Sequence, residues 1–541
     1  MDIKRKISRQ LFCTVLLFSL SFAGKAQYLP IIPQPQHVVV EEGKLTISQE
    51  LVIHATPLAE RAVTYLREEL DSRFQRFAFV HTDRPAQLLF ETISTDDGGG
   101  DEYYELEVRR SDIIIRATGP TGYFRAVSSL LQLLESVKSG KQLELPLLKI
   151  KDQPRYGWRG FMLDESRHFF GKEKVKQLLD WMAFYKLNVF HWHLTDEPAW
   201  RIAIKKYPFL TLVGGIGSYT DPTNPAKYYS QEDIKEVVAY AQSLYIRVVP
   251  EIDMPGHATA ANRAYPSLSG GGTEEHPHFT FHPAKETTYT FLANVLKETN
   301  MLFPSNLLHL GGDEVAFGSD AWNKDAKIDS LKSRLGFLSN KDVETYFMRR
   351  MADTVYSIGA KLLVWDEMAD AGLPVDKSIL FWWRHDKISQ FDLLQKKGYP
   401  TVVCPRLPFY FDFVQDEKDE NGRKWGEAFN SLMSVYRYDI TALEGRAINK
   451  DLILGVQANL WTERVASDMK LEYMTFPRIA ALAEVAWTKD ARKNEENFRA
   501  VLKKQLSLYR RDNLYFYDPF AHGNVEPAAP VINKKYIDNP E

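Results

Sequence analysis

Cysteine is almost absent from this chain, whose 541 residues include only Cys13 and Cys404. Cys13 lies in a segment that we expect to be removed, so no disulfide bond can form within the remaining chain. This excludes the small secreted domains that depend on disulfides for stability. A basic excess is also missing, because 68 lysines and arginines face 71 acidic residues, for a net charge of −3. Nucleic-acid-binding proteins usually carry such an excess, so we expect no nucleic-acid partner.

Long apolar runs are scarce as well. Basic residues at positions 4–9 precede an apolar run over 11–23, and small residues follow it. The run is too short to span a bilayer comfortably, so residues 1–26 are typical of a secretory signal peptide. We expect an exported protein, periplasmic in the first place, with secretion or association with the outer membrane as alternatives. Lipidation of Cys13 stays open, although Leu11-Phe12 is a poor lipidation signal. No other segment reaches about 18 apolar residues, so no membrane span is expected.

A repeating pattern of apolar strand and amphipathic helix begins after Pro154. No G-x-G-x-x-G follows its first strand, which argues against the alternative of a doubly wound, dinucleotide-binding sheet. Near-continuous apolar strands that alternate with helices indicate a parallel sheet covered by helices. We therefore predict an α/β fold, a TIM (β/α)8 barrel catalytic domain over residues 151–520, followed by a C-terminal tail over 521–541. Its expected strands lie within eight segments: 160–164, 188–194, 245–253, 307–314, 360–367, 378–383, 401–405 and 452–461.

Residues 27–150 have a different pattern, with short β-rich segments at 45–55, 86–92 and 103–118 and helical spacing at 58–74 and 121–137. This predicts a small α+β domain before the barrel. It carries no recognisable chemistry, so we interpret it as an accessory domain.

Acidic residues gather where the predicted barrel strands end. Asp-Glu pairs follow four of these strands, at 164–165, 196–197, 313–314 and 366–367. Active sites of TIM barrels lie at the carboxyl ends of the strands, and converging carboxylates serve general acid–base catalysis. The pair Asp313-Glu314 is distinguished by Gly311-Gly312 before it, since glycines allow a backbone or ligand to approach closely.

Aromatic residues fall at the same strand ends: Trp200, Trp365, Trp382, Trp383, Tyr410 and Trp461. For each of them alone, packing in the core would be an ordinary explanation. Aromatic faces also stack on the C–H surfaces of sugar rings, while acids bind their hydroxyls. Together with the acids, this set predicts a carbohydrate pocket.

A metal site is the competing interpretation of the same region. His191 and His193 are two residues apart on a strand and so point to one face. With His257, His309 and Asp313 they are possible zinc ligands of a barrel hydrolase. Core histidines with hydrogen-bond partners are the more ordinary explanation of the pattern, and a sugar-binding protein without catalysis is a further alternative.

Seven strings at strand ends, or in the helix that follows, resemble those of the family 20 glycoside hydrolases, the β-N-acetylhexosaminidases. In chain order they are RGFMLDESRHF, HWHLTDEPAWR, EIDMPGHA, LHLGGDE, VWDE, GVQANLWTE and FPRIAALAEVAW. GGDE followed by LWTE at this distance is a specific match. The resemblance covers nearly all of the chain after the expected signal peptide, although the match before the barrel is only architectural.

This resemblance implies an exo-acting hydrolase that removes terminal β-linked N-acetylhexosamine from glycans with retention, with no cofactor and no metal. The substrate's own 2-acetamido oxygen serves as the nucleophile in that family. Glu314 matches the acid/base residue, Asp313 the residue that orients the acetamido group, and Tyr410 the donor to its oxygen. Asp196 and His257 match a polar relay behind the acid.

The remaining site residues are implied in the same way. Trp365, Trp382 and Trp461 match the wall around the acetamido methyl, Arg167 and Glu463 the pair that binds the 3- and 4-hydroxyls, and Asp412 the contact to the 4- or 6-hydroxyl. The chain departs from the usual glutamine and glycine at Glu197-Pro198-Ala199, so its outer pocket is open to question.

The substrate remains open at this point. Preference between GlcNAc and GalNAc, the natural glycan and the oligomeric state cannot be deduced, and release of a disaccharide, as by a lacto-N-biosidase, is an alternative. Loops at 263–282 and 412–435 are candidates to shape the pocket beyond the terminal sugar.

Overall fold

The computed structural model describes residues 28–47, 50–74, 78–79, 85–94, 100–138 and 143–531. The expected signal peptide over 1–26, with Cys13, lies outside the described residues, and export stays a prediction. Within the described part of the chain, no helix is both long and apolar enough to cross a membrane.

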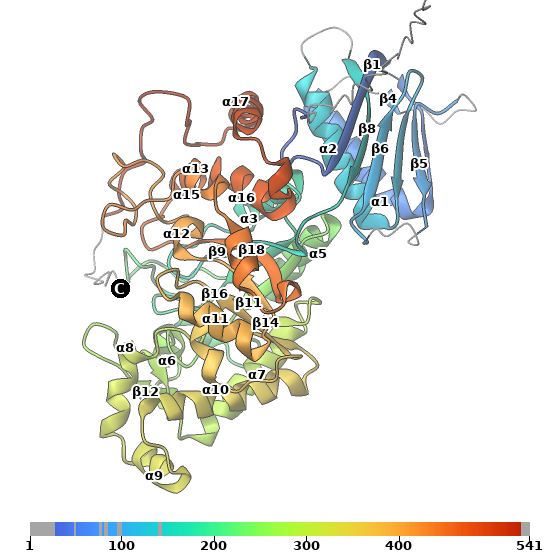
Figure 1. Ribbon diagram of the computed structural model, residues 1–541. Coiled ribbons are helices and arrows are strands. Elements are labelled where there is room, and N and C mark those ends of the chain that lie inside the picture. Colours follow the sequence, from blue (N-terminus) through green and yellow to red (C-terminus); the bar gives the residue numbers. More distant parts are fainter. Residues whose placement is uncertain are drawn as a thin grey trace, which may run out of the picture.

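A six-stranded sheet forms the N-terminal region (Figure 1). In spatial order its strands are β1 (His37–Ile47), β8 (Leu143–Asp152), β6 (Tyr104–Val108), β7 (Ile113–Ala117), β5 (Leu88–Thr92) and β3 (Ile53–Ala55). Side chains alternate between buried and partly buried along β6, as in a sheet packed on one face. The helices α1 (Glu60–Phe74) and α2 (Pro120–Ser136) contribute their apolar side chains to the core of this region. The predicted α+β arrangement is confirmed.

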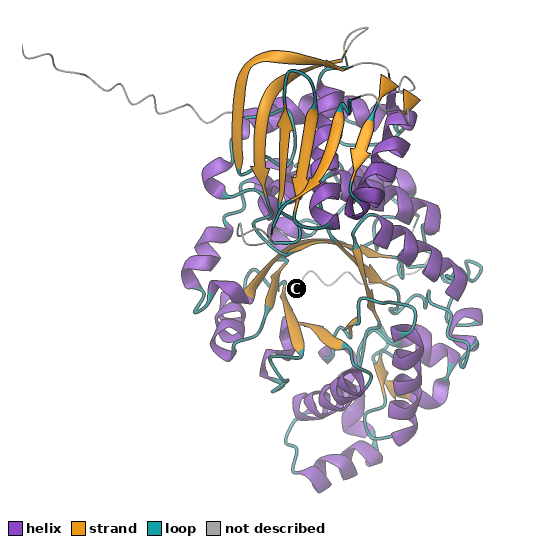
Figure 2. Ribbon diagram, turned by 90° about the vertical axis from the view of Figure 1, so that its right-hand side faces the viewer, coloured by secondary structure: helices purple, strands orange, loops and turns teal. Residues whose placement is uncertain are grey.

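Eight parallel strands close into a barrel below this sheet, as the view along the barrel in Figure 2 shows. Around the barrel they are β9 (Trp158–Asp164), β10 (Val189–His193), β11 (Arg247–Glu251), β14 (Leu307–His309), β15 (Lys361–Trp365), β16 (Ser378–Trp382), β17 (Thr401–Val403) and β18 (Ile453–Leu460). The barrel closes where β18 pairs with β9. Each strand overlaps one of the predicted segments, and the predicted TIM barrel is confirmed.

Helices surround the barrel and bury its outer face. The longer ones are α3 (Lys172–Phe184), α5 (Gln231–Ser243), α7 (Glu286–Asn300), α10 (Asn340–Ser357), α11 (Ile388–Lys397), α16 (Arg478–Trp487) and α17 (Glu495–Arg511). Side chains alternate across each strand, so Ile379 and Phe381 of β16 point into the barrel, while Leu380 and Trp382 join the layer under the helices. This alternation decides which residues of a strand end reach the pocket.

Buried ionic contacts connect the N-terminal sheet to the barrel. Nη1 of Arg159, on β9, donates to Oε1 of Glu102 at 3.0 Å. Asp152, at the end of β8, accepts from Nε1 of Trp487 at 3.0 Å and pairs with Lys186 at 3.3 Å. Burial alone would raise the pKa of Glu102. The guanidinium groups of Arg159 and Arg125 outweigh burial and lower this pKa to about 2. These contacts lie near the amino ends of the barrel strands and away from the catalytic face.

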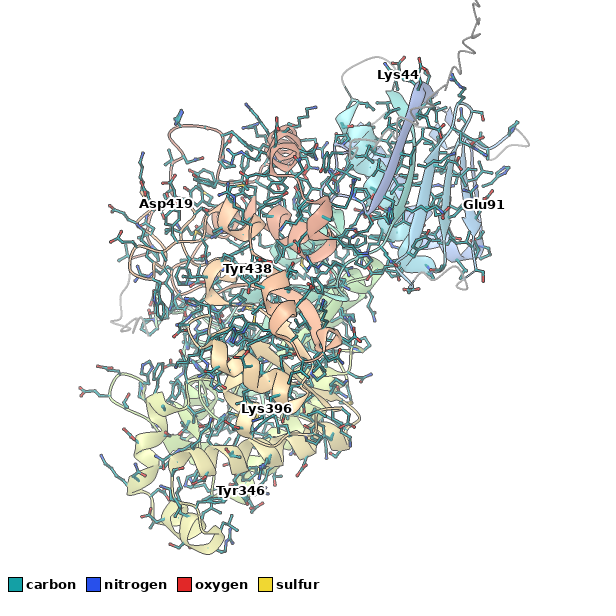
Figure 3. The ribbon with its side chains drawn as sticks, viewed as in Figure 1. Lys44, Glu91, Tyr346, Lys396, Asp419 and Tyr438 are labelled. Atoms are coloured by element: carbon teal, nitrogen blue, oxygen red, sulfur yellow. The ribbon has the colours of Figure 1, made fainter. Side chains whose placement is uncertain are left out.

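The two loops singled out in the sequence lie at the opposite, carboxyl end of the barrel. Within 263–282, β12 (Ser269–Gly271) pairs with β13 (Thr280–Phe281) in a small antiparallel hairpin. Within 412–435 lies Asp419, which is labelled in Figure 3. Its carboxylate accepts a hydrogen bond of 3.1 Å from the Tyr473 hydroxyl, which anchors this loop to the barrel domain.

Candidate active site

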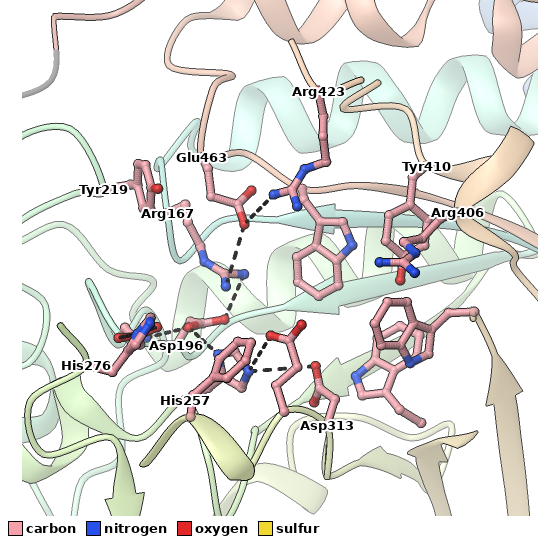
Figure 4. A pocket seen from close by; sticks show the side chains of 16 residues that line it. Arg167, Asp196, Tyr219, His257, His276, Asp313, Arg406, Tyr410, Arg423 and Glu463 are labelled. Atoms are coloured by element: carbon pink, nitrogen blue, oxygen red, sulfur yellow. Dashed lines mark hydrogen bonds and ion pairs between the residues drawn. The ribbon is translucent and has the colours of Figure 1, made fainter. Parts of the chain in front are cut away.

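A pocket opens at the carboxyl ends of the barrel strands (Figure 4). Its lining consists of acidic, basic and aromatic side chains: Arg167, Asp196, Glu197, Tyr219, His257, His276, Asp313, Glu314, Phe317, Trp365, Trp383, Arg406, Tyr410, Arg423, Trp461 and Glu463. All the site residues implied by the family resemblance are among them except Trp382 and Asp412. Trp200, one of the aromatics named at the strand ends, and the possible metal ligands His191, His193 and His309 do not line the pocket. Of the four Asp-Glu pairs, those at 196–197 and 313–314 line the pocket, whereas those at 164–165 and 366–367 do not.

The assignment of Trp382 to the pocket wall is wrong by one residue. The Trp382 ring packs against Phe391 of α11, with 5.4 Å between ring centroids, on the helix side of β16. Trp383 lines the pocket instead, stacked on Tyr410 with an interplanar angle of 14°. Neighbouring residues of a strand point to opposite sides, so only one of two adjacent tryptophans can face the pocket.

Asp412 lies directly behind the pocket surface. Its Oδ2 pairs with Nε of Arg423 at 3.0 Å, and Arg423 is the side chain that lines the pocket. Burial raises the pKa of Asp412 to about 7, although the charge of Arg423 opposes the shift. Arg423, from the loop at 412–435, therefore stands between the expected sugar-binding carboxylate and the pocket.

A tight turn presents Asp313 and Glu314 at the end of β14. Gly311 and Gly312 adopt φ angles of 63° and 91°, which side chains rarely allow. A Cβ atom on Gly311 would lie 1.8 Å from the Oδ1 atom of Asp253, so the first glycine is required by that neighbour. Glu314 itself has φ of 51°, an unfavourable conformation of the kind that clusters at functional sites.

A chain of ion pairs and one hydrogen bond supports the two carboxylates. The Nε2 atom of His257 lies 3.6 Å from Oε2 of Glu314 and 3.8 Å from Oδ2 of Asp313. On its other side, Nδ1 of His257 lies 3.0 Å from Oδ1 of Asp196. The second oxygen of Asp196 pairs with Nη1 of Arg167 at 2.7 Å. His257 thus touches both carboxylates with one ring nitrogen and is oriented through the other.

Charge around His257 sets the pKa values of these groups. Burial alone would lower the pKa of His257, but the carboxylates of Asp196 and Asp253 raise it well above 6.5. Burial favours a neutral Glu314, yet the adjacent imidazolium outweighs this and lowers its pKa. Burial raises the pKa of Asp313 to about 8, and the charge of Glu314 adds to the effect. Of these two neighbouring carboxyls, Asp313 therefore has the higher pKa in the unliganded site.

Beneath the pocket lies a group that we call the inner network: His191, His193, Glu251, His309 and Trp365. Oε2 of Glu251 binds Nδ1 of His193 at 2.6 Å and Nε2 of His191 at 3.0 Å. Its Oε1 accepts from Nε1 of Trp365 at 3.0 Å and lies 2.8 Å from Nδ1 of His309. Nε2 of His193 continues to Asp196 at 2.9 Å. A continuous polar chain thus runs from the barrel interior to the residues around Glu314, and Glu251 is its centre.

Sequence analysis did not single out Glu251, because in the sequence this residue is only the end of a predicted buried strand. The parallel pairing that sets Glu251 of β11 beside His193 of β10 and His309 of β14 is visible only in the folded barrel.

Some of these donors could also hold a metal ion. One ligand atom each from His191, Glu251 and His309 lie within 4.8 Å of one another, as do those of Asp253, His257 and Asp313. The histidines of the inner network also have hydrogen-bond partners: Nδ1 of His191 accepts from Nε2 of Gln457 at 3.0 Å, and Nδ1 of His309 accepts from the amide of Gly311 at 3.1 Å. The predicted alternative of histidines with hydrogen-bond partners therefore accounts for His191, His193 and His309.

Aromatic rings form the wall opposite His257. Tyr410 and Trp365 lie 6.2 and 6.1 Å from Trp461 between ring centroids. The guanidinium of Arg167 lies 5.2 Å from the centre of the Trp461 ring, where its charge is attracted to the ring face. Arg167 also lies 3.8 Å from Glu463, so the expected pair for sugar hydroxyls is brought together.

Several lining residues had no signal in the sequence. Tyr219, His276, Phe317, Arg406 and Arg423 lie in loops or very short helices after strand ends, where no periodic pattern marks them. His276 and Arg423 come from the two loops that sequence analysis had left open.

A pocket with paired carboxylates and an aromatic wall, at the carboxyl face of a TIM barrel, defines a barrel glycoside hydrolase as the class of protein. Comparison with known families agrees. The glycosyl hydrolase family 20 catalytic domain matches residues 156–490, and domain 2 of the same family matches residues 28–153. The chain belongs to glycosyl hydrolase family 20.

Individual relatives support this assignment. A β-hexosaminidase of Vibrio furnissii is 34% identical over 484 residues, covering 85% of this chain and 77% of the relative. The structure of an exo-β-N-acetylglucosaminidase from Vibrio harveyi, with N-acetylglucosamine, has a TM-score of 0.84 at 30% identity and covers 91% and 79% of the two chains. A β-N-acetylhexosaminidase from Bacteroides fragilis has a TM-score of 0.78 at 30% identity, covering 90% and 97%.

Proposed function

We propose that this protein hydrolyses terminal, β-linked N-acetylhexosamines with retention, using the 2-acetamido oxygen of the substrate as nucleophile. The observation that carries the proposal is the position of the two carboxylates. Asp313 and Glu314 reach the same ring nitrogen of His257, at 3.8 and 3.6 Å, and so lie on one side of the pocket. A nucleophilic carboxylate would have to face the acid across the glycosidic bond, about 5–5.5 Å away.

Each residue then has a role. Glu314 protonates the leaving oxygen and later deprotonates water, and Asp313 accepts the acetamido N–H and stabilises the positive charge that develops. Tyr410 donates to the acetamido oxygen, and Trp365, Trp383 and Trp461 enclose its methyl group. Holding a nucleophile within the substrate in place exploits the high effective concentration of intramolecular reactions.

Substrate binding changes the pKa values of the two carboxyls in this proposal. Before substrate enters, the pKa of Asp313 is raised and that of Glu314 is lowered, whereas the reaction needs the proton on Glu314. A hydrogen bond from the acetamido N–H favours ionised Asp313 and lowers its pKa. The charge on Asp313 then raises the pKa of Glu314, so binding of the acetamido group prepares the acid.

The test compares aryl β-glycosides of GlcNAc, GalNAc and glucose, each with and without EDTA. We expect cleavage of the acetamido sugars only, with no loss in chelator, and the β-anomer as the first product in NMR spectra. Replacing the acetyl by a trifluoroacetyl group weakens the nucleophile and should reduce the rate steeply. Cleavage of the glucoside at a similar rate, or a first product of α configuration, would contradict the proposal. Loss of activity with EDTA would favour the metal-dependent alternative.

A further inference from the structure

A second group of side chains lines the same pocket beyond the residues with a proposed role in catalysis, and we call it the outer cluster: Glu197, His276 and Phe317. Glu197 follows β10, His276 lies in the loop between β12 and β13, and Phe317 lies in the short helix α8 (Ala316–Ser319). Three segments far apart in the sequence therefore meet at one place on the pocket wall.

The outer cluster is held in place by its own contacts. Nδ1 of His276 lies 3.0 and 2.9 Å from the two carboxylate oxygens of Glu197. The imidazole ring is stacked on Phe317, with 5.4 Å between centroids and an interplanar angle of 19°. An edge contact with Phe279, at 5.5 Å, supports it from the side. Few rotamers remain to be fixed when a ligand binds, so the cluster is organised in advance.

Its position places it on the leaving-group side of the reaction. The amide of Phe317 donates to the carbonyl oxygen of Glu314 at 3.0 Å, so the ring lies one turn after the proposed acid. In Figure 4, His276 lies at the end of the pocket opposite Tyr410 and Arg406, which border the acetamido side. Glu314 must reach the oxygen that leaves, and Phe317 is three residues from Glu314. A group on that oxygen that extends away from the acetamido side therefore meets the outer cluster.

We propose that the outer cluster is a binding subsite for the sugar ring that leaves, and that Glu197, His276 and Phe317 make this subsite selective for a second, neutral sugar. The inference rests on the proposed function and identifies the group that leaves in that hydrolysis. The stacked rings of His276 and Phe317 match the flat C–H face of a pyranose, and the carboxylate of Glu197 accepts from its hydroxyls. The carboxylate and the imidazolium offset each other's charge, which leaves no unpaired cation in the cluster for an acidic sugar.

The experiment compares two substrates that share the terminal sugar and have alkoxide leaving groups: the β-1,4-linked disaccharide of N-acetylglucosamine and methyl β-N-acetylglucosaminide. Only the disaccharide offers a ring to the outer cluster. The readout is the ratio of kcat/KM for the two substrates in the wild type and in Phe317→Ala, Glu197→Gln and His276→Gln. Phe209→Ala and His522→Gln are the matched controls, since both residues are exposed and neither lines the pocket.

We expect Phe317→Ala to reduce this ratio about tenfold, because a stacking contact to the leaving ring is lost. Glu197→Gln and His276→Gln should reduce it about threefold to tenfold, and the controls should leave it unchanged. Thermal unfolding of each variant shows that it is folded. If wild type cleaves both substrates but all three ratios equal the wild-type ratio, the inference is wrong while the proposed function stands. If wild type cleaves neither these substrates nor the aryl N-acetylhexosaminides, the proposed function itself is wrong.

Discussion

The inner network and the outer cluster are two polar regions of one pocket, built in different ways. The inner network belongs to barrel strands; its histidines and Glu251 are fully buried, and the Glu251 carboxylate has four nitrogen partners within 3.0 Å. The outer cluster belongs to loops and a short helix, its side chains are partly exposed, and a carboxylate–imidazole pair, a ring stack and an edge contact with Phe279 hold it. The barrel therefore holds the catalytic charges rigidly, whereas the loops hold contacts that can change between relatives without loss of the fold.

The largest effect on activity is expected at the acid that the inner network supports. Glu314→Gln should reduce kcat/KM about 100- to 10,000-fold on the disaccharide, where the leaving oxygen needs a proton. Aryl glycosides with highly activated leaving groups should lose far less. Steady-state kinetics on both substrates measure the difference. Equal losses on the two would contradict the assignment of Glu314 as the acid.

Glu251→Gln tests the inner network itself. Removing one partner of a buried ionic group should lower the free energy of unfolding by about 3 kcal/mol near pH 6. The pKa of Glu251 is lowered well below 4.5, because its histidine neighbours outweigh burial, and the same carboxylate helps raise the pKa of His193 well above 6.5 despite burial. The stabilisation is therefore complete between about pH 4.5 and 6.5. It declines as Glu251 is protonated at lower pH and as pH rises toward the pKa of His193.

Denaturant unfolding of the wild type and Glu251→Gln between pH 4 and 9 measures this dependence. Glu173→Gln is the control, since the Glu173 side chain is 79% exposed. A stability difference that does not shrink above pH 6.5 would show that the charge of Glu251 does not stabilise the imidazolium.

Trp382, the last residue of β16, and Trp383, which follows it, allow a matched comparison of packing with binding. Trp383→Leu should reduce kcat/KM on acetamido sugars about tenfold, because a pocket ring is lost. Trp382→Leu should instead lower the free energy of unfolding by about 3 kcal/mol through a cavity under α11, with kcat/KM within twofold of wild type. If Trp382→Leu reduced kcat/KM and Trp383→Leu only lowered the free energy of unfolding, Trp382 would be the tryptophan that faces the pocket.

The smallest effect is expected at the rim. Arg423→Ala removes the ion pair with Asp412 at a guanidinium that is 31% exposed. Pairs this exposed contribute about 0–1 kcal/mol, so we expect KM to rise by no more than about fivefold with kcat nearly unchanged. Lys424→Ala, at the neighbouring position, is the control. A loss above about a hundredfold would place Arg423 among the residues that act on the reacting bond.

Local patterns predicted what depends on local chemistry. The eight strands, the turn at Gly311-Gly312 and the family strings were visible because apolar runs, glycines and acids mark strand ends whatever lies around them. The choice between Trp382 and Trp383 failed because the face of a strand depends on its register in the closed barrel. Asp412 was named as a lining residue, but Arg423 covers it and lines the pocket instead. No local pattern in the sequence marks Arg423.

By itself, the sequence determined the barrel, the α+β domain before it, the family and the pair Asp313-Glu314, because each rests on periodicity or on residues close together in the chain. Only the tertiary structure decided that Glu251 joins three histidines, that Trp383 faces the pocket, and that His276 meets Glu197 and Phe317. These contacts join strands and loops distant in sequence, and their geometry follows from the closure of the barrel and from how its loops fold back over the rim.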